Sequence, residues 1–437
     1  MRKMKDSGFD WIGEIPVTWQ IKRIKNIGQA RNGLTYTPND VCDPSEGTLV
    51  LRSSNIKDGK ISLSDCVYVS CAIPSKLKVK EGDILICSRN GSRELVGKSA
   101  LIGNIDASYG AFMMVFRCRN PKYMFYVLNS NIFSYYLGSF STSTINQLTG
   151  ADFGNMRIAY CPDMTEQKKI ADFLDEKCGE IDSIKADVQR QIELLNDYKK
   201  SVITEAVTKG LNPKAKLKDS DIEWVGKIPE YWEVKKTKYC FEFGKGLPIT
   251  KENLEDSGIS VISYGQIHSK QNNGTSVNSS LIRFVNESYL RTNPLSLVHK
   301  NDFIFADTSE DLDGCGNCVY IDTKEPIFAG YHTIIFRSKQ PDAKYFAYLF
   351  LTDCWRSQIR KVASGVKLFS ITQKILKETS VIIPPLSEQK EIANYLDEKC
   401  SEIDAVIADK QKQLETLDEY KKSLIFEYVT GKKEVVQ

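Results

Sequence analysis

Two stretches of the sequence place apolar side chains at steps of three and four, with charged residues between them. The first begins at Glu166 and reads EQKKIADFLDEKCGEIDSIKADVQRQIELLNDYKKSVITEAVT. The second begins 222 positions later, at Glu388, and reads EQKEIANYLDEKCSEIDAVIADKQKQLETLDEYKKSLIFEYVT. This spacing is typical of an amphipathic helix. We therefore expect two long helices that are copies of one another, with an apolar seam formed by Ile181, Ile184, Val188, Ile192, Leu195, Val202, Ile403, Val406, Leu414, Leu417 and Leu424.

The ends of both helices are marked by helix-breaking residues. Pro384 and Pro385 prevent helix before the second copy, and Gly210 and Gly431 are expected stops. Roughly 40 helical residues span about 60 Å, which exceeds the width of a small domain. Because so long an apolar seam needs a partner, we predict that the two helices form an antiparallel pair. The alternative is that each helix folds back on its own neighbouring block.

A second duplication precedes each helix. The segment KDSGFDWIGEIPVTWQIKRIK from Lys5 reappears as KDSDIEWVGKIPEYWEVKKTK from Lys218, 213 positions later. The chain therefore alternates between variable blocks and helical repeats, which divides it into segments 1–162, 163–212, 213–384 and 385–437. In this repeat the C-terminal tail occupies the place where the first helix leads into the second block, so we expect the chain termini to lie close together.

Both variable blocks have the pattern of a mixed α/β domain. Short apolar runs bounded by glycines and polar residues are typical of strands, and a helical stretch follows them at 123–136 and at 345–359. We expect an α+β fold, with two globular domains of one kind separated by the paired helices in a pseudo-two-fold symmetric arrangement. The expected strands cover residues 49–51, 83–87 and 113–117, and 260–263, 302–305 and 333–337.

Composition narrows the function classes. A hydrophobic fraction of 41% and a charged fraction of 26% are typical of a soluble globular protein. We find no secretory signal and no apolar run long enough for a membrane span, so we expect a cytoplasmic protein whose twelve cysteines are reduced thiols. The net charge of +3 is nearly balanced. Any DNA binding must therefore use local basic patches.

Signatures of nucleotide or methyl-transfer chemistry are weak. The sequence contains no G-x-x-x-x-G-K-[ST] phosphate loop. The glycine-rich segment 243–246 corresponds to Gly33-Leu34 in the first block, which favours a shared structural loop over a cofactor site. A base methyltransferase needs a polar-Pro-Pro-aromatic motif, and the nearest approach, Asn293-Pro294-Leu295-Ser296, lacks it.

Metal-site signatures are equally incomplete. Cys315 and Cys318 have the spacing of zinc ligands, but no second pair lies nearby and the chain has only three histidines. The acidic run 305–313, FADTSEDLD, allows a carboxylate cluster, although we favour a loop held by local turn hydrogen bonds. We therefore expect no catalytic residue, no metal and no cofactor.

Taken together, these features resemble the specificity subunits of type I restriction-modification systems, over essentially the whole chain. The resemblance rests on PPLSEQKEIANYLDEK and its copy CPDMTEQKKIADFLDEK, the twin openings WIGEIP and WVGKIP, and the phrases EGDIL and FADTSED. The first copy departs from the pattern because Cys161-Pro162-Asp163-Met164 lacks the double proline, so its helix should begin less sharply.

The resemblance implies a non-catalytic subunit of a larger complex. Each variable block would be a target-recognition domain that reads one half of a bipartite double-stranded DNA site. The paired helices would set the spacing between the halves and dock two methyltransferase subunits, and motor-nuclease subunits would join the full assembly. Two alternatives stay open: an adaptor whose blocks bind proteins, which the near-neutral charge favours, and a self-contained modification enzyme.

Sequence-specific readout needs loop side chains that can satisfy base edges, with Arg suited to guanine and Asn or Gln to adenine. Such side chains follow the expected strands in both blocks. The candidates are Arg52, Asn55, Arg89, Asn90, Ser92, Asn146, Gln147, Tyr264, Gln266, Ser309, His332 and Lys367. The candidate phosphate contacts, which position without specifying, are Lys22, Arg23, Lys25, Lys235, Lys236 and Lys238.

Overall fold

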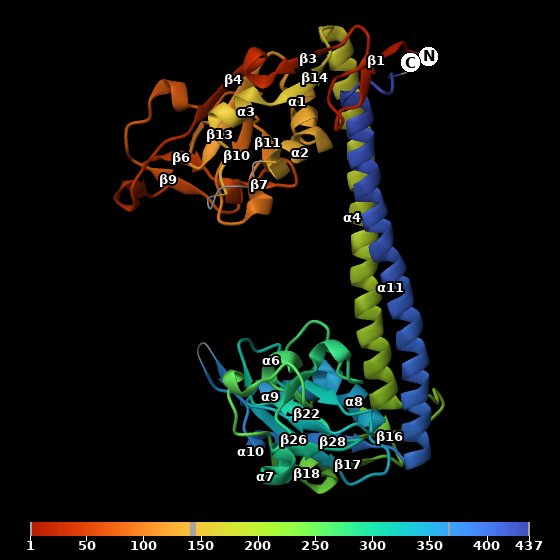
Figure 1. The fold of residues 1–437 in the computed structure, drawn as a ribbon. Coiled ribbons are helices and arrows are strands. Elements are labelled where there is room, and N and C mark those ends of the chain that lie inside the picture. The colour runs from red at the N-terminus through yellow and green to blue at the C-terminus, as the bar shows by residue number, and fades with distance from the viewer. Residues whose placement is uncertain (1, 140–145, 366–367, 436–437) are drawn as a thin grey trace. The chain divides into compact units, whose positions relative to one another are not determined.

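The computed structural model describes residues 2–139, 146–365 and 368–435. They form two compact units: unit 1 comprises Met1–Gln189 and Gln411–Gln437, and unit 2 comprises Arg190–Lys410. The division runs through both long helices, α4 (Met164–Lys209) and α11 (Leu386–Val429). Each unit therefore contains one globular domain and part of each long helix (Figure 1).

The globular domain of unit 1 is built on two four-stranded sheets. The first contains, in spatial order, β11 (Ser99–Leu101), β10 (Ile84–Cys87), β13 (Met113–Cys118) and β4 (Gly28–Asn32). The second contains β12 (Ala107–Tyr109), β6 (Thr48–Leu51), β9 (Val67–Val69) and β5 (Val41–Cys42), with β12 and β6 parallel. The remaining strand pairs are β1 (Met4–Asp6) with β2 (Glu14–Pro16), β3 (Gln20–Arg23) with β14 (Arg157–Tyr160), and β7 (Ile56–Lys57) with β8 (Lys60–Ile61).

Unit 2 also contains two four-stranded sheets: the first has the same strand order as in unit 1, whereas in the second the short fourth strand joins the opposite edge. The first contains β18 (Phe241–Lys245), β26 (Thr333–Ser338), β22 (Phe303–Ala306) and β24 (Cys318–Tyr320). The second contains β20 (Arg283–Val285), β19 (Ile259–Ile262), β25 (Ile327–Ala329) and β21 (Leu297–Val298), with β19 and β25 parallel. The remaining pairs are β15 (Leu217–Asp219) with β16 (Lys227–Pro229), β17 (Glu233–Lys236) with β28 (Ser380–Ile383), and β23 (Thr308–Ser309) with β27 (Phe369–Ser370).

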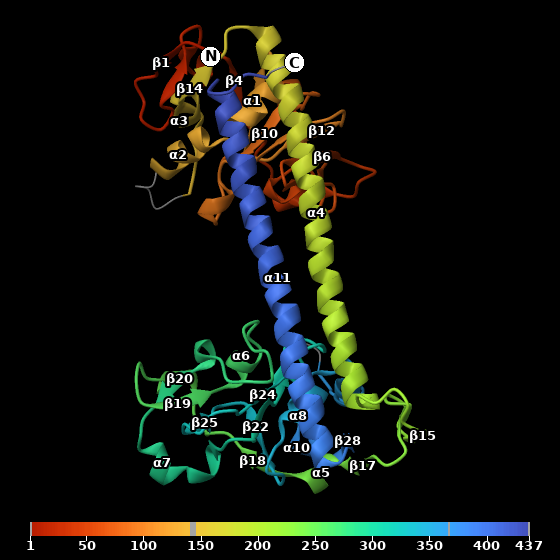
Figure 2. The ribbon, with the colours of Figure 1, turned by 90° about the vertical axis from the view of Figure 1, so that its right-hand side faces the viewer.

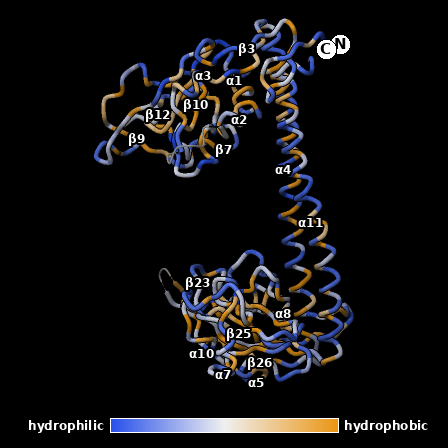
Figure 3. The backbone as a smooth tube through the Cα atoms, in the orientation of Figure 1, coloured by the Kyte–Doolittle hydropathy of each residue, from blue (hydrophilic) through white to orange (hydrophobic). Residues whose placement is uncertain are grey.

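The central strands are buried on both faces, which explains their continuous apolar runs. In β10, Ile84 and Ile86 pack with the helices of unit 1, whereas Leu85 and Cys87 pack against the second sheet. In β22 the phenylalanines Phe303 and Phe305 likewise face the helices, and the intervening residues face the second sheet. Figure 3 shows hydrophobic segments in the strands of each unit and a mixed pattern along α4 and α11.

Each expected helical stretch of the globular domains is divided into two helices. In unit 2 the division falls at Thr352, whose hydroxyl donates to the carbonyl of Leu349 (2.7 Å) and accepts from the amide of Trp355. In unit 1, Ser130 makes the first of these bonds with Val127 (2.6 Å). The helices of the globular domains are α1 (Pro121–Leu128), α2 (Asn131–Ser139), α3 (Gly150–Asn155), α5 (Thr237–Cys240), α6 (Tyr264–Ile267), α7 (Tyr289–Thr292), α8 (Lys344–Leu351), α9 (Asp353–Arg360) and α10 (Gln373–Glu378).

The predicted antiparallel pairing of α4 and α11 is confirmed within each unit. In unit 1, Ile181 of α4 belongs to one apolar core with Leu424 of α11, and the two helices lie side by side in both views (Figure 1, Figure 2). The ion pair of Lys421 with Asp182 (2.6 Å) joins the helices there. In unit 2 the residues displaced by 222 positions form the same pair, Lys199 with Asp404 (2.6 Å). One register therefore serves both units.

Two residues predicted for the apolar seam lie outside it. Ile184 is 46% exposed and Val406 is 44% exposed, so their assignment was wrong. Steps of three and of four residues both fit an amphipathic pattern. Here the buried face continues from the buried Ile181 and Ile403 by a step of four, to the half-buried Lys185 and Ile407, so the residue at the step of three is exposed. The other seam candidates are buried (Ile181, Val188, Ile192, Ile403, Leu424) or half-buried (Leu195, Val202, Leu414, Leu417).

Both long helices begin and end alike. The first helix starts without a double proline because the side chain of Asp163 accepts from the amide of Thr165 (2.8 Å), so its start is as sharp as the other. Gly210 (φ +75°) and Gly431 (φ +71°) then leave the helical conformation, as expected of stops. Near the second of these ends, Arg2 forms ion pairs with Glu166 and, at 3.5 Å, with Glu434. The terminal segments of unit 1 therefore lie together.

Candidate nucleic-acid interface

The loops that follow β6, β10 and β12 line an open cleft of about 1130 Å³ in unit 1. Four of the predicted base-reading residues lie on this cleft: Arg52, Arg89, Asn90 and Asn146. They come together because β6 and β12 run parallel in one sheet and β10 lies in the sheet stacked against it. Strands of a rigid scaffold therefore place polar loop side chains around one hollow.

Three of the four side chains hold the loops together. Nδ2 of Asn90 donates to the hydroxyl of Ser53 (3.1 Å), and its Oδ1 accepts from the amide of Ser92 (3.0 Å). Asn146 donates to the carbonyl of Gly91 (2.9 Å). Arg52 is paired with Asp65 (2.9 Å). These bonds fix the walls of the cleft and occupy part of each side chain's hydrogen-bonding capacity.

Arg89 differs from its neighbours because it forms no ion pair with any residue in the described ranges. Its side chain is exposed, and its guanidinium carbon lies 5.1 Å from the ring centroid of Phe112. Phe112, which follows β12, is itself 58% exposed. Gln147 is exposed and forms an isolated antiparallel β-bridge with Arg89. Ser92 is also exposed. Phe112 was not predicted as a site residue, although the repeat aligns it with His332.

Two predicted base-reading residues are internal to the fold, and their assignment was wrong. Asn55 is fully buried: its amide donates to the carbonyls of Ser62 (2.9 Å) and Asp65 (2.8 Å), and its oxygen accepts from the amide of Arg52. Ser309 is 2% exposed and donates to the carbonyl of Asp311 (2.7 Å). Both side chains serve turn chemistry, which uses the same residue types as base recognition.

In unit 2 the loops after β19, β22 and β25 form the corresponding surface. The rings of Tyr264 and His332 lie 5.4 Å apart, and Nδ1 of His332 lies 3.3 Å from the carboxylate of Asp307. His332 has a positive φ of +55°, a strained conformation for a residue with a side chain. Gln266 uses its oxygen to cap the turn at Ser263 (3.1 Å) and is half-buried. Lys367 lies outside the described residues.

A half-buried polar network supports these loops of unit 2. Nε2 of His268 donates to the carbonyl of Thr308 (2.8 Å), and its Nδ1 accepts from Asn317 (3.1 Å). The oxygen of Asn317 in turn accepts from Arg356 (2.6 Å). The loop containing FADTSED is thus held by hydrogen bonds, which agrees with the structural role that we favoured for it over a carboxylate cluster.

The predicted phosphate contacts differ between the units. In unit 1, Lys22, Arg23 and Lys25 join Arg157 around a cleft of about 460 Å³, and none of the four is ion-paired with a described residue. In unit 2, Lys235 is paired with Glu233 (2.5 Å), Lys238 with Glu378 (2.8 Å), and Lys236 donates to a carbonyl (2.6 Å). Among the described residues, carboxylates therefore neutralise two of the three lysines in unit 2 and none of the four cations in unit 1. Hydrogen bonding to Glu378 also raises the pKa of Lys238.

The glycine-rich segment of unit 2 is structural. A Cβ on Gly246 would lie 1.9 Å from the carbonyl oxygen of Gly330, and one on Gly33 would lie 2.2 Å from that of Gly110. Both glycines allow the same close approach of two backbone segments. The shared loop of the repeat thus has a packing role in each unit.

The cysteine pair of unit 2 lies in the hydrophobic core. Cys315 and Cys318 are buried, and burial raises the pKa of both thiols, that of Cys318 to about 12. Neutral thiols are poor metal ligands. Within the described part of the chain, no three His, Cys, Asp or Glu side chains are grouped so as to hold a metal ion. No helix of that part is long and apolar enough to cross a membrane.

Each globular domain is anchored to a long helix by three residues, and these residues have equivalent positions in the two units. In unit 1 the carboxylate of Asp175 accepts from the hydroxyl of Tyr126 (2.7 Å) and from Lys122 (2.6 Å). In unit 2, Asp397 accepts from Tyr348 (2.5 Å) and is paired with Lys344 (3.2 Å). Burial, followed by this hydrogen bond, raises the pKa of both tyrosines, so both phenols stay protonated donors. The aspartate of the LDEK phrase thus fixes each globular domain to its long helix.

Replacing Asp397 with alanine is expected to lower the free energy of unfolding by about 1 kcal/mol, because a charge-assisted hydrogen bond is lost at a partly exposed site. Chemical denaturation of the full chain measures this change. Asp409→Ala on the exposed face of the same helix is the control and should leave the midpoint unchanged. Equal effects of the two substitutions would show that the anchor contributes nothing.

Two segments of this chain match the model of one known protein family. A family model described as the type I restriction modification DNA specificity domain matches residues 16–194 and, a second time, residues 229–416. These two matches cover most of the chain. The chain belongs to the type I restriction-modification DNA specificity family. The resemblance inferred from the helical repeats and the twin openings is thereby confirmed.

Two relatives in this family match the chain along most of its length. It is 28% identical to a Methanocaldococcus jannaschii protein provisionally named the MjaX type I restriction enzyme specificity subunit, over 96% of this chain and 95% of that protein. It is 25% identical to the EcoKI specificity subunit of Escherichia coli K12, over 90% of this chain and 84% of the relative.

Solved structures of the family share the fold. A chain from a structure on complex assembly and conformational transition of the type I R-M system has a TM-score of 0.71 at 14% identity, covering 96% of this chain and 99% of its own. The HsdS subunit of Thermoanaerobacter tengcongensis has a TM-score of 0.50 at 14% identity, covering 96% and 98%. The predicted α+β fold class, with two long paired helices, is confirmed.

Proposed function

We propose that this chain reads a bipartite double-stranded DNA site on behalf of a type I restriction-modification complex, one half-site for the globular domain of each unit. The observation that supports this best is that equivalent loops carry different side chains. Unit 1 presents Arg89 and Phe112 where unit 2 presents Thr308 and His332. One scaffold with two sets of loop side chains suits two unlike half-sites.

The four segments of the chain take separate roles in this proposal. Segments 1–162 and 213–384 recognise DNA, and segments 163–212 and 385–437 set the spacing and dock two methyltransferase subunits. The duplicated helices carry exposed tyrosines at equivalent positions, Tyr198 (51% exposed) and Tyr420 (57% exposed), which suits two copies of one partner. Motor-nuclease subunits join the full complex in the cytoplasm. The chain is a specificity subunit, and we assign it no catalytic step.

Within each unit a subset of the predicted residues is placed to read DNA. In unit 1 these are the residues around the larger cleft, with Arg89 foremost. In unit 2 they are Tyr264 and His332. Lys22, Arg23 and Lys25, with Arg157, are the proposed phosphate contacts, because nothing in the described part of unit 1 neutralises them.

A map of methylated bases in the host genome tests this function. With the gene intact, we expect one motif made of two unlike halves separated by a fixed gap, and we expect deletion of the gene to remove only that motif. A deletion that leaves every methylated motif in place, together with equal binding of all duplexes by the purified complex, would reject DNA reading and favour a protein adaptor.

A further inference from the structure

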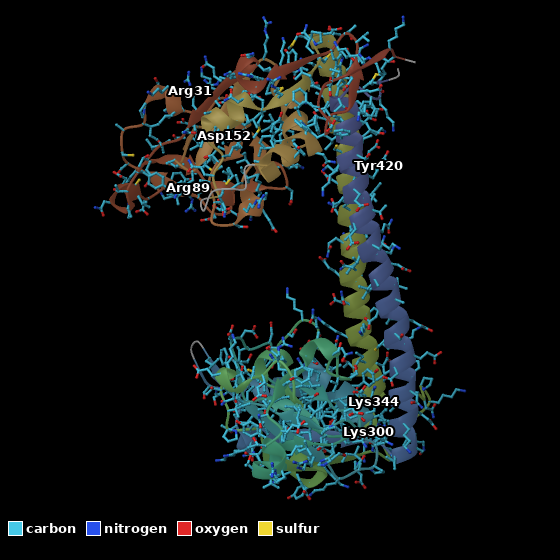
Figure 4. The ribbon with its side chains drawn as sticks, in the orientation of Figure 1. Arg31, Arg89, Asp152, Lys300, Lys344 and Tyr420 are labelled. Atoms are coloured by element: carbon cyan, nitrogen blue, oxygen red, sulfur yellow. The ribbon has the colours of Figure 1, made fainter. Side chains whose placement is uncertain are left out.

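Among the described residues that line it, the larger cleft of unit 1 presents one cation whose donors are not used to build the protein. Asn90 and Asn146 are bonded to the neighbouring loops, and Arg52 is bonded to Asp65. Arg89 is exposed and forms no ion pair within the described ranges. Figure 4 shows Arg89 on the side of unit 1 that faces away from α4. Its guanidinium is therefore available to a ligand in the cleft.

The surroundings of Arg89 restrict how its guanidinium can be presented. The amides of Ser88 and Arg89 both donate to the carbonyl of Phe112 (2.9 and 3.1 Å), which fixes the two loops to one another. The guanidinium lies over the Phe112 ring, 5.1 Å from its centroid, and such contacts favour a flat arrangement. An exposed phenylalanine at this position supports the arginine rather than the core, since the ring is 58% exposed.

A flat guanidinium offers two parallel N–H donors. The matching pair of acceptors on a DNA base edge is O6 and N7 of guanine, in the major groove. We propose that Arg89, supported by Phe112, reads a guanine in the half-site that unit 1 recognises. This inference rests on the proposed function, because it names the base that one reading domain requires.

The same position in unit 2 has different chemistry. Thr308 stands in place of the arginine, and His332, paired with Asp307, stands in place of the phenylalanine. In the described part of unit 2, no arginine therefore stands at that point of the scaffold. The arginine-dependent guanine is therefore expected in one half-site only, and substitutions of Arg89 should leave the other half-site unchanged.

The test uses the complex of the full chain with its methyltransferase partner and a library of randomised duplexes sorted by methylation. Arg89→Ala and Arg89→Lys are compared with the unchanged chain. We expect a guanine at one position of one half-site, and we expect both substitutions to reduce its preference on the order of ten- to a hundredfold. Lysine keeps the charge but cannot offer two parallel N–H donors, so this variant separates base reading from phosphate binding.

Arg31→Ala is the matched control. This arginine lies in the same unit on β4 and is held by the side chain of Gln29 (3.0 Å) and the carbonyl of Lys76. Its loss removes the same charge without touching the larger cleft, so base preferences should stay as in the unchanged chain. As a second measurement, 7-deazaguanine at the selected position should weaken binding of the unchanged complex and leave Arg89→Ala unaffected.

Three outcomes would overturn the inference. Uniform weakening across sequences, with near-normal behaviour of Arg89→Lys, would make Arg89 a phosphate contact. Unaltered base preferences in both variants would place Arg89 outside the interface. Selection of a half-site without a guanine that depends on Arg89 would also contradict it. If the unchanged complex selects no bipartite site at all, the proposed function fails instead, whatever Arg89 does.

Discussion

Insertion of four residues after Gln191 and four after Gln413 is expected to lengthen the gap between the two half-sites while both half-sites keep their sequence. Four residues are close to one helical turn, so the apolar seam keeps its face, and each helix grows by about 6 Å. Because DNA rises about 3.4 Å per base pair, the gap should grow by one or two base pairs. Mapping of methylated bases in cells that carry the inserted chain measures the change.

The control for this prediction is an insertion in one helix alone. Lys421 pairs with Asp182 in unit 1 and Lys199 with Asp404 in unit 2, in one antiparallel register. An insertion of four residues after Gln191 alone would lengthen α4 but not α11, so the ion pairs of unit 1 and unit 2 could no longer form in one register. We therefore expect a less stable chain and loss of methylation. A double insertion that keeps the original gap would contradict the proposal that the helices set the spacing.

Replacing Gly246 with alanine is expected to destabilise unit 2 strongly. The added Cβ would lie 1.9 Å from the carbonyl oxygen of Gly330 and 2.2 Å from the hydroxyl of Thr333. One of these atoms belongs to the backbone, so a side-chain rotation cannot relieve the contact. We expect a loss of about 3 kcal/mol in the free energy of unfolding, measured by chemical denaturation.

A second glycine in the same unit provides the comparison. Around Gly265 no heavy atom would lie within 4 Å of an added Cβ, so Gly265→Ala should leave the denaturation midpoint nearly unchanged. Gly33→Ala in unit 1, with its contact of 2.2 Å to Gly110, should reproduce the effect of Gly246→Ala. Equal midpoints for the two unit 2 variants would show that the loop adapts and that the glycine-rich segment is retained for another reason.

Much of the fold could be predicted because its constraints are local in the sequence. The runs at β10 and β22 are apolar throughout because helices cover one face and a second sheet covers the other. The helical repeats could be predicted from the spacing of their apolar residues and from their duplication. The apolar seam was harder to predict, because steps of three and of four residues are both allowed. Only the packing of α4 against α11 shows that Lys185 is half-buried and that Ile184 is exposed.

The candidate site could be predicted only in part. The sequence placed the candidates on loops after strands, and Arg89, Asn90 and Asn146 do line one cleft. Asn55 and Ser309 were wrong because short polar side chains that can read bases also cap turns, and burial decides between the two uses. Phe112 was missed because an isolated phenylalanine after a strand carries no polar signal.

In the proposed function, two unlike reading domains act independently on one duplicated scaffold. The most direct test is a chain in which segment 1–162 replaces segment 213–384, so that both positions carry the first domain, followed by mapping of the bases that its complex methylates. We expect the first half-site to appear twice, as an inverted repeat across the gap. Retention of the original second half-site by this folded chain would contradict the account.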